Sequence, residues 1–539
     1  MRRAARLWVA LVLAFGCEGT PVVYSPGGEV PMAFPPEVGA DPTSAAAFDP
    51  RLDGFESVEL RFAVRHAQGA TCTIALAQGD VDLGELDGAI RGDTCSAAWN
   101  GTDATGAVVA PGIVEATAMV ARGSDAARTT SEVEVLRLGV SEVRLGGSAR
   151  VPLLYSRLDG VRFGYHEVAA TEVPWRLAPD ARESGGTPLE LADGSARAKP
   201  TPWEDLESPP LDGAYPDGIE RDTFSLPTAW VAGATPDVGV TFTTAHAGGV
   251  STPTVEVRVV APEGLSLLDE GTVTDGADAS FEATSLPVPA VGRYDVTWAW
   301  TFEARRSAAD AWVALPGRFE TTHRLYGLVA EPTFDYSEVP HRAWVDVVDR
   351  IAGWVDGASA DPDTVAARIV EGVYTELGLE YDRVAGASHY TGYGSGFTRA
   401  TFELSRFAHT ENGTVINCSD AASIVSTYAN MVGIDLRYHI LQHQRLDRFE
   451  LNWLAAIGFD FAPSPFLSGR SAFRYHAVTG PPSTNIFDAT LAVDGDADPG
   501  SAPNELLLVQ NLTESEYLMR LSPEPDQIRV YVDEKVRLR

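Results

Sequence analysis

Three side chains in the C-terminal part of the chain have the types and the order of a nucleophilic active site. Cys418 lies in the segment NGTVINCSDAASIVSTYANMVGIDLRYHIL, residues 412–441, and it is the only cysteine after Cys95. A thiolate nucleophile needs a base, and His476 in AFRYHAVTG is the best candidate among the ten histidines. Asp488, in NIFDATLAV, would hold the tautomer of the imidazole and stabilise its charged form. These residues predict covalent catalysis with a thiolate nucleophile.

A helix is expected to begin at Cys418 and to hold the thiol in its first turn. Asn417 is a good N-cap, Asp420 can reach back in a capping box, and Gly433 is expected to end the helix. Apolar residues recur between them at helical spacing and give a broad buried face. The unpaired N–H groups and the positive end of the helix dipole would stabilise a thiolate, and they could donate to an oxyanion.

His476 and Asp488 are predicted to face each other across a β-hairpin. Both lie in strand-like runs, and a Gly-Pro-Pro turn at residues 480–482 separates these runs. Because Pro482 lies midway between the two positions, a symmetric hairpin would place them directly opposite each other, with Cβ atoms roughly 4.5–5.5 Å apart. A β-bulge would change this register.

This order of residues resembles the transglutaminase-like superfamily of papain-type cysteine enzymes over about residues 340–500. The matching residues are Cys418, Gly433, Arg437, His476, Asp488 and Thr490. The resemblance implies that Cys418 is the nucleophile, His476 the general base and acid, and Asp488 the orienting carboxylate. Many members of the superfamily have Gly two residues before the cysteine and Trp two residues after the histidine, whereas this chain has Ile416 and Val478. The resemblance therefore does not identify the oxyanion hole or the acyl-acceptor pocket.

Two classes of function follow from these residues. The first is a cysteine enzyme that needs no cofactor and acts on amide bonds of a protein or peptide substrate, as a protease, an amidase or an acyltransferase. The alternative is a catalytically inactive surface scaffold or peptide-binding lipoprotein. A lone cysteine on a helix can also be a small buried hydrophobe.

The other histidines and the acidic residues do not have the spacing of metal ligands. His439 and His443 are expected on one strand, where residues four apart are about 13 Å apart and cannot share an ion. His409, just before the cysteine segment, would either line a pocket or be solvated. The acidic loop at residues 203–222 lacks the ligand spacing of a calcium-binding loop. No metal site is predicted.

The N-terminus has the features of an export signal. Three arginines precede an apolar run at residues 7–15, which is too short to span a bilayer as a mature helix. We expect residues 1–16 to be a signal peptide. The segment LAFGC resembles a bacterial lipobox, which implies that Cys17 is lipidated and that the protein is anchored in the cell envelope, at the outer membrane or cell surface. A plainly secreted protein is the alternative.

The remaining cysteines and the charge agree with an exported protein. Cys72 and Cys95 lie in one β-rich region and are predicted to form a disulfide, which leaves Cys418 unpaired if Cys17 carries lipid. The net charge of −34 argues against nucleic acid as a partner and against binding to anionic lipid except through the anchor. The sequence does not indicate an oligomeric state.

The chain is expected to be multidomain, with N-terminal all-β immunoglobulin-like sandwich domains followed by an α+β transglutaminase-like, papain-like domain. Residues 17–50 are predicted as a flexible tether, 51–140 as an immunoglobulin-like domain, and 141–335 as one or two β-sandwich-like domains. WNGTDATGAVVAPG, with Trp99 and three turn-spaced glycines, resembles the module found in the flagellar hook-capping protein. Residues 336–539 form the last domain, with a C-terminal β extension. Helices are predicted at about 344–355 and 363–377, the second capped by Asp361 or Asp363.

Overall fold

The computed structural model describes residues 34–538 with gaps. The gaps are residues 42–46, 51–56, 111, 137, 148, 159–162, 168–174, 177–200, 203–223, 244–254, 268–271, 274–278, 306, 316, 334–342, 394–399, 483–484 and 533–534. The expected signal peptide, the predicted lipidation site Cys17 and the acidic loop at 203–222 lie outside the described residues.

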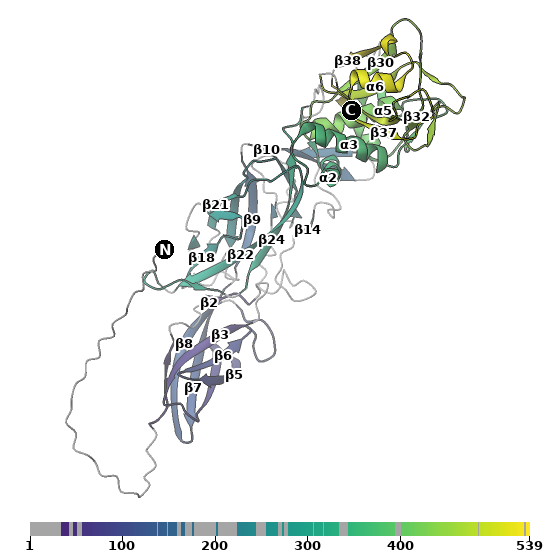
Figure 1. The fold of residues 1–539 in the computed structure, drawn as a ribbon. Helices are drawn as coiled ribbons and strands as arrows, with labels where there is room; N and C mark the ends of the chain where they lie inside the picture. The colour runs from purple at the N-terminus through teal and green to yellow at the C-terminus, as the bar shows by residue number, and fades with distance from the viewer. Residues whose placement is uncertain are drawn as a thin grey trace, which may run out of the picture.

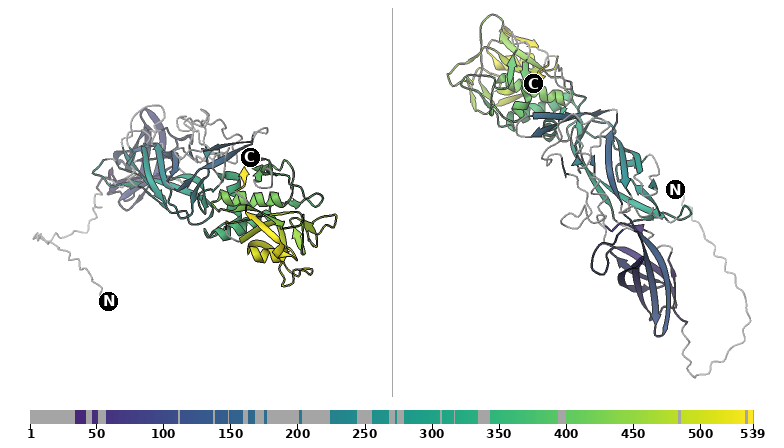
Figure 2. Two further views of the ribbon diagram at one scale, coloured as in Figure 1. Left: turned by 90° about the horizontal axis from the view of Figure 1, so that it is seen from above. Right: turned by 180° about the vertical axis from the view of Figure 1, so that it is seen from behind.

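The described chain is mainly β-structure in several sheets, as the sequence predicts for a multidomain, largely β protein. An N-terminal sheet, a middle pair of sheets and a C-terminal part with helices follow one another along an elongated molecule (Figure 1). The view from behind shows the same succession (Figure 2). No described helix is both long enough and apolar enough to cross a membrane.

The N-terminal part is an eight-stranded sheet with the strand order β1-β3-β6-β5-β4-β7-β8-β2. Its strands are β1 (Glu37–Ala40), β2 (Ala47–Phe48), β3 (Val58–Arg65), β4 (Thr71–Gln78), β5 (Val81–Arg91), β6 (Thr94–Trp99), β7 (Gly112–Arg122) and β8 (Asp125–Val135). Buried and exposed residues alternate along β3, so that one face of this strand lies in the core. β1 and β2 fall within the expected tether but join the sheet, because Phe48 is fully buried and packs edge-on against Trp99 at 5.2 Å between ring centroids.

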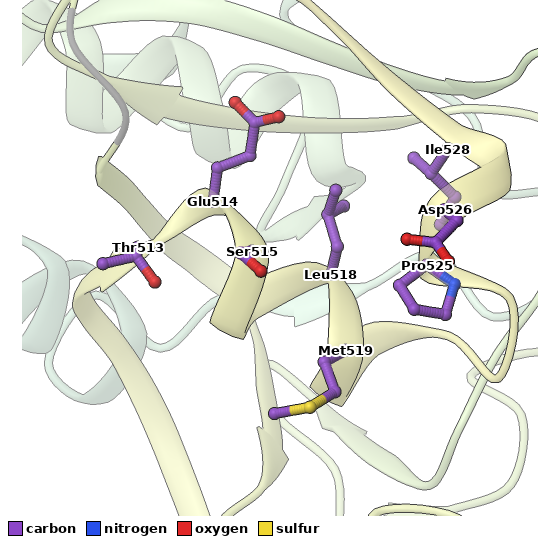
Figure 3. Close-up of a pocket in the computed structure, with 8 residues that line it drawn as sticks. All are labelled: Thr513, Glu514, Ser515, Leu518, Met519, Pro525, Asp526 and Ile528. Atoms are coloured by element: carbon purple, nitrogen blue, oxygen red, sulfur yellow. The ribbon is translucent and has the colours of Figure 1, made fainter.

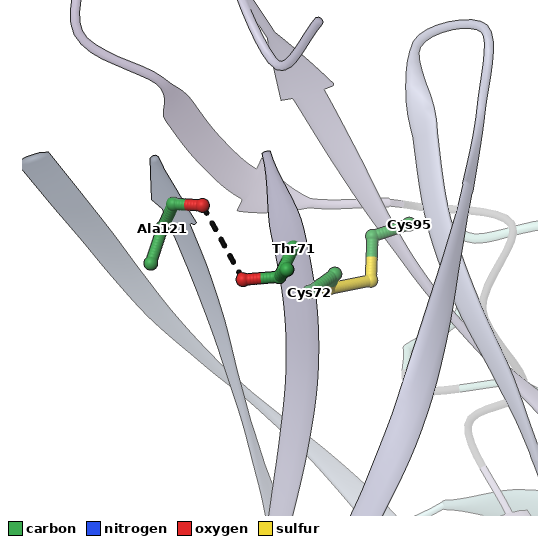
Figure 4. The surroundings of a disulfide bond; sticks show 4 residues. All are labelled: Thr71, Cys72, Cys95 and Ala121. Atoms are coloured by element: carbon green, nitrogen blue, oxygen red, sulfur yellow. Dashed lines mark hydrogen bonds between the residues drawn. A yellow bond between two sulfur atoms is a disulfide. The ribbon is translucent and has the colours of Figure 1, made fainter. Parts of the chain in front are cut away.

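The predicted disulfide between Cys72 and Cys95 is confirmed. It links β4 to β6 across β5, with 6.4 Å between the two Cα atoms (Figure 4). Both cysteines are buried, and a Cβ atom at Gly88 of β5 would lie only 2.7 Å from the Cys95 sulfur. The disulfide therefore fits under the sheet because Gly88 lacks a side chain.

Removing this disulfide should destabilise the N-terminal part. Replacing Cys72 and Cys95 together by alanine should lower its free energy of unfolding by about 3 kcal/mol, the chain-entropy contribution of a loop of this length. Urea unfolding of oxidised wild type and of the double variant measures the difference, and reduced wild type should behave like the variant. A non-reducing peptide map with either cysteine joined to Cys418 would contradict the pairing.

The middle part consists of two main sheets around one hydrophobic core. One has the order β10-β16-β24-β22-β18-β20 with β23 beside β22, and the other β14-β15-β13-β9-β17-β21-β19. The strands are β9 (Gly139–Gly146), β10 (Arg150–Val151), β11 (Leu153–Leu158), β12 (Phe163–Glu167), β13 (Trp175–Arg176), β14 (Thr201–Pro202), β15 (Phe224–Ser225), β16 (Thr228–Val231), β17 (Asp237–Thr243), β18 (Glu256–Val260), β19 (Leu265–Leu267), β20 (Thr272–Val273), β21 (Ala279–Ser285), β22 (Gly292–Arg305), β23 (Val313–Ala314) and β24 (Phe319–Leu328). Trp298, Trp300 and Phe242 fill the space between the two sheets. One hydrophobic core therefore spans both main sheets.

The C-terminal part places helices on a sheet of order β33-β32-β36-β35-β30-β38, with β37 beside β36. Its helices are α2 (Val345–Trp354), α3 (Pro362–Thr375), α4 (Leu404–Ala408), α5 (Cys418–Met431) and α6 (Glu514–Leu521), and residues Pro525–Gln527 form a short 3₁₀ turn. Its strands are β25 (Ala343–Trp344), β26 (Glu380–Tyr381), β27 (Thr391–Tyr393), β28 (Ala400–Phe402), β29 (Val415–Ile416), β30 (Arg437–His443), β31 (Phe449–Glu450), β32 (Leu454–Ala456), β33 (Phe461–Ala462), β34 (Ala472–Phe473), β35 (His476–Gly480), β36 (Asn485–Asp494), β37 (Leu506–Thr513), β38 (Ile528–Val532) and β39 (Arg537–Leu538). All residues of α5 are buried, because the helix packs on β35 and β36 and is covered by α2 and α3. The predicted helices near 344–355 and 363–377 are confirmed as α2 and α3, and the side chain of Asp361 caps α3.

The segment after β24 joins the middle part to the end of α5. The N–H groups of Val329 and Ala330 both donate to the Val432 carbonyl oxygen, at 3.0 and 3.2 Å. On β24 itself, the Tyr326 hydroxyl donates to Asp349 of α2 at 2.7 Å. Residues of both parts also share one hydrophobic core. The middle part is therefore bound directly to the helix that carries Cys418 at its other end.

Candidate active site

Cys418 occupies the first position of α5, as the sequence predicts. The Asn417 side-chain oxygen accepts from the N–H groups of Ser419 and Asp420 at 2.9 and 3.1 Å, and the Asp420 carboxylate completes the capping box. Gly433 follows the helix with φ +87°, as expected for the residue that ends it. The Asn417 side chain accepts from the N–H groups of Ser419 and Asp420, the two residues after Cys418. The Cys418 N–H, in contrast, has no acceptor among the described residues. It is the group of this turn best placed to donate to an oxyanion.

His476 and Asp488 lie in hydrogen-bond contact, but not in the register that the sequence predicts. The observed pair across β35 and β36 is Thr479 opposite Phe487, so the hairpin is displaced by two residues from the predicted one, and the prediction of a directly opposite pair is wrong. Strand side chains repeat every two residues, so a shift of two keeps both residues on one face. His476 Nε2 therefore still lies 2.9 Å from Asp488 Oδ2.

The Asp488 carboxylate is held by three donors. Its Oδ2 atom accepts from His476 Nε2 and from the Tyr517 hydroxyl, at 2.9 and 2.8 Å. Its Oδ1 atom accepts from the Thr490 backbone N–H at 2.7 Å. Thr490 was noted in the sequence only as a match to the superfamily, and the structure shows that its backbone fixes the carboxylate. Tyr517, on α6, was not identified from the sequence.

The His476 imidazole is fully buried, and Asp488 favours its charged form. Burial alone would lower the pKa of His476, but the charge and hydrogen bond of Asp488, together with Cys418, raise it to about 9. The other ring nitrogen, Nδ1, makes no hydrogen bond of good geometry with the described residues. The Phe473 ring stacks on the imidazole, with 5.1 Å between ring centroids and planes 7° apart. The ring is therefore fixed with Nε2 on Asp488 and Nδ1 available to the thiol.

This raised pKa predicts a loss of stability at alkaline pH. The folded protein holds the His476 proton more tightly than the unfolded chain, whose histidines titrate near pH 6.5. The contribution of His476 to the free energy of unfolding is therefore complete below about pH 6.5 and is lost as the pH rises through about 9. Between pH 6 and pH 9.5, the urea midpoint of unfolding should fall further in wild type than in His476→Gln. Equal falls would contradict this prediction.

Five tyrosines lie close enough to the thiol for its charge to act on them, and none of them was identified as a site residue from the sequence. They are Tyr381, Tyr393, Tyr438, Tyr475 and Tyr517, which we call the tyrosine cluster. Burial raises the pKa of each of these tyrosines above the usual value of 10. The charge of Cys418 is among the charges that raise it further. Two hydroxyl contacts tie the cluster to the helix and to itself, Tyr475 to Ser419 at 3.2 Å and Tyr393 to Tyr438 at 3.0 Å. The cluster therefore stays protonated at neutral pH.

Asp420 anchors a loop beside the first turn of α5. Its buried carboxylate accepts from the Ser388 hydroxyl at 2.6 Å and from the N–H groups of His389 and Tyr390 at 2.8 and 2.9 Å. Asn417 Nδ2 donates to the Gly386 carbonyl oxygen of the same loop at 3.0 Å. The residues that cap the helix thus also hold the chain that leads to Tyr393 of the tyrosine cluster.

The two residues that depart from the superfamily pattern are both buried strand residues. Ile416 lies in β29, parallel to Tyr381 of β26. Val478 lies in β35 opposite His439 of β30. Ile416 thus pairs with Tyr381, a member of the tyrosine cluster.

The other candidate histidines have structural surroundings. His439 is buried, and burial followed by the charge of Arg437 lowers its pKa to about 4. His443 Nδ1 accepts from the N–H groups of Arg445 and Leu446, so it holds a turn. His409 occupies the C-cap position of α4, where its backbone N–H donates to carbonyl oxygens of the helix. The described residues contain no group of three or more His, Cys, Asp or Glu side chains that could hold a metal ion.

A surface pocket lies beside α6 (Figure 3). It is lined by Thr513, Glu514, Ser515, Leu518, Met519, Pro525, Asp526 and Ile528. None of the predicted site residues contributes to it. Cys418 itself is only 3% exposed. The thiol is therefore almost completely covered by neighbouring groups.

Comparisons with known proteins do not assign a family. The sequence matches no protein-family model and no curated protein sequence. Similar solved structures include red sea bream transglutaminase, with 8% identity, a TM-score of 0.14, and coverage of 54% of this chain and 30% of that chain. They also include a protein of unknown function from Porphyromonas gingivalis W83, with 10% identity, a TM-score of 0.13, and coverage of 54% of this chain and 99% of that chain. A protein of Corynebacterium diphtheriae described as membrane anchored has 9% identity, a TM-score of 0.14, and coverage of 55% of this chain and 59% of that chain. Identities and TM-scores this low carry no argument about fold or function.

Proposed function

We propose that this protein is a transglutaminase-like cysteine enzyme that acts on amide bonds of a protein or peptide substrate, as a hydrolase or an acyltransferase. The observation that carries the proposal is the buried His476, which is bound to Asp488 through Nε2 and leaves Nδ1 free beside Cys418. A structural histidine would satisfy both ring nitrogens or stay neutral on burial. This one is held charged, next to the single free cysteine of the described chain.

The proposed reaction uses the groups in a fixed order. The Cys418 thiolate forms a bond to the amide carbonyl carbon, and the Cys418 N–H stabilises the resulting oxyanion. His476 then gives its Nδ1 proton to the nitrogen, which leaves as ammonia or an amine, and a thioester remains. Neutral His476 accepts a proton from water or a second amine as it attacks the thioester, and the thiolate is released. Asp488 stabilises the imidazolium before and after these transfers.

Alkylation by iodoacetamide tests whether Cys418 is an activated nucleophile. Wild type should be labelled at Cys418 below the pH at which an ordinary free cysteine reacts, because the imidazolium and the helix N-terminus favour the thiolate. His476→Ala should slow labelling at pH 6 by about tenfold or more, since the positive partner is lost. Cys418→Ala should remain folded and show neither labelling nor turnover. Slow labelling at all pH values and indifference to His476 would refute the proposal.

A catalytically inactive scaffold is the second candidate function, and the burial of the thiol favours it. A buried hydrophobic cysteine contributes to packing, so Cys418→Ala would then lower the free energy of unfolding by about 1–2 kcal/mol. The enzyme proposal expects a smaller loss of stability, because the polar tyrosine cluster lies close to the thiol.

We further propose that the β-rich parts are immunoglobulin-like spacers, and that a lipid on Cys17 anchors the chain in the bacterial envelope. The elongated arrangement would hold the C-terminal part away from the membrane (Figure 1). The strongly acidic chain makes nucleic acid an unsuitable partner.

The anchor predicts a change in partitioning when Cys17 is replaced. Wild type expressed in a bacterium should partition into detergent with its N-terminus at acylated Cys17, and Cys17→Ser should be recovered in the aqueous phase, because a lipid chain supplies the membrane affinity. Phase separation and mass spectrometry of the N-terminal peptide measure both. Aqueous wild type that begins at another residue would show that the protein is secreted without an anchor.

A further inference from the structure

Tyr517 reaches the same carboxylate oxygen as the histidine of the candidate site. It lies on the buried face of α6 with 0% exposure, and its hydroxyl donates to Asp488 Oδ2 at 2.8 Å. The same atom accepts from His476 Nε2 at 2.9 Å. The Thr490 N–H occupies the other carboxylate oxygen. One oxygen therefore divides its negative charge between a tyrosine and the imidazole.

The Tyr517 hydroxyl acts only as a donor. Burial, and then the charge and hydrogen bond of Asp488, raise the pKa of Tyr517 well above its usual value of 10. The tyrosine therefore keeps its proton at every pH at which the site would work. A fixed donor on Oδ2 stabilises the carboxylate charge and weakens the attraction of that oxygen for the imidazolium.

The strength with which Asp488 holds His476 in its charged form matters for the proposed reaction. An imidazole held too strongly in its charged form would fail to release its proton to the leaving amine, and efficient proton transfer needs a group that exchanges protons near the working pH. Asp488 pulls His476 toward the charged form, and Tyr517 is the side chain placed to moderate that pull. Its position on α6, 29 residues after the aspartate, brings a separate element to the site for this contact.

We propose that Tyr517 is a positioning residue of the reaction: its hydroxyl holds Asp488 Oδ2 and limits how strongly His476 retains its proton. This inference rests on the proposed function, because it assigns Tyr517 a role in the chemistry of Cys418.

Tyr517→Phe in the full chain tests the inference, because phenylalanine keeps the ring and removes only the hydroxyl. The readout is the rate of Cys418 alkylation by iodoacetamide as a function of pH. In a cysteine–histidine pair this rate rises where the thiolate–imidazolium pair forms and again where the imidazolium loses its proton. The second rise should move up by about half to one pH unit in Tyr517→Phe. This is less than the full contribution of a hydrogen bond to a charged group, because the lost bond acts on the imidazolium only through Asp488.

Tyr326→Phe is the matched control. The Tyr326 hydroxyl also belongs to a buried tyrosine, and it donates to an aspartate, Asp349, at 2.7 Å where β24 meets α2. This variant loses the same kind of bond away from His476 and should leave both rises unmoved. Urea unfolding of the two variants shows whether each is folded.

The outcomes separate the inference from the function on which it rests. Two rises in wild type with a second rise that stays in place or moves down in Tyr517→Phe would overturn the role of Tyr517 and leave the enzyme proposal standing. Equal shifts in Tyr517→Phe and Tyr326→Phe would overturn it as well, because a general loss of stability would explain both. A wild type whose Cys418 shows no rise at any pH would overturn the proposed function and this inference together.

Discussion

Asp488→Asn should lower turnover of a peptide amide substrate on the order of 10⁴-fold, comparable to the loss when the orienting aspartate of a catalytic triad is replaced by asparagine. The carboxylate accepts from three donors, the His476 ring, the Tyr517 hydroxyl and the Thr490 N–H. An asparagine has one acceptor oxygen, and its amide nitrogen can only donate. One of the three donors must therefore lose its acceptor, and an amide nitrogen facing Nε2 would favour the wrong tautomer of the imidazole.

Release of ammonia or amine measures the effect of Asp488→Asn, and circular dichroism should show the native fold. Asp494→Asn is the matched control, because Asp494 is a fully buried aspartate of the same strand, β36. Its carboxylate accepts from the Asp496 N–H at 2.8 Å and makes no described contact with His476. Its turnover should stay within about twofold of wild type, since a substitution away from the site leaves the transition-state contacts unchanged. Similar losses of turnover in both variants would contradict the assignment of Asp488.

Gly433→Ala should be strongly destabilising, by about 2–4 kcal/mol, because two costs combine at this position. Gly433 has φ +87°, a backbone conformation that side chains other than glycine rarely adopt. A Cβ atom there would also overlap the backbone of Ala330, lying 2.6 Å from its Cα atom. The backbone of Ala330 cannot move freely, since its N–H donates to Val432. Urea unfolding measures the loss.

Gly378→Ala separates the two costs. Gly378 follows α3 with φ +63°, and a Cβ atom there would have no neighbour within 4 Å. It should therefore show only the conformational cost, about 1 kcal/mol. Losses of equal size in Gly378→Ala and Gly433→Ala would mean that the contact with Ala330 contributes nothing.

The parts of the site that the sequence predicts are set by short-range spacing. Asn417, Asp420 and Gly433 define the helix that begins at Cys418, because caps act within one turn of the helix ends. Alternation places His476 and Asp488 in neighbouring strands and on one face. The structure places the imidazole of His476, the histidine chosen from the ten, in contact with the Asp488 carboxylate. The register of the hairpin differs from the predicted one by two residues.

Tertiary structure decided what surrounds these residues. Tyr517 reaches Asp488 from 29 residues away, Ser388 reaches Asp420 across 32 residues, and Ala330 packs on Gly433 from another part of the chain. Such contacts depend on how separate elements pack, and no local spacing in the sequence encodes that packing. The two-residue displacement of the hairpin has the same origin, because strand pairing and burial on both sides of the sheet fix the register, whereas the turn sequence alone permits several. The sequence by itself therefore determined the helix that begins at Cys418 and the two polar residues, His476 and Asp488, on neighbouring strands. Only the packed structure determined which oxygen meets which nitrogen, and which tyrosines share the buried site.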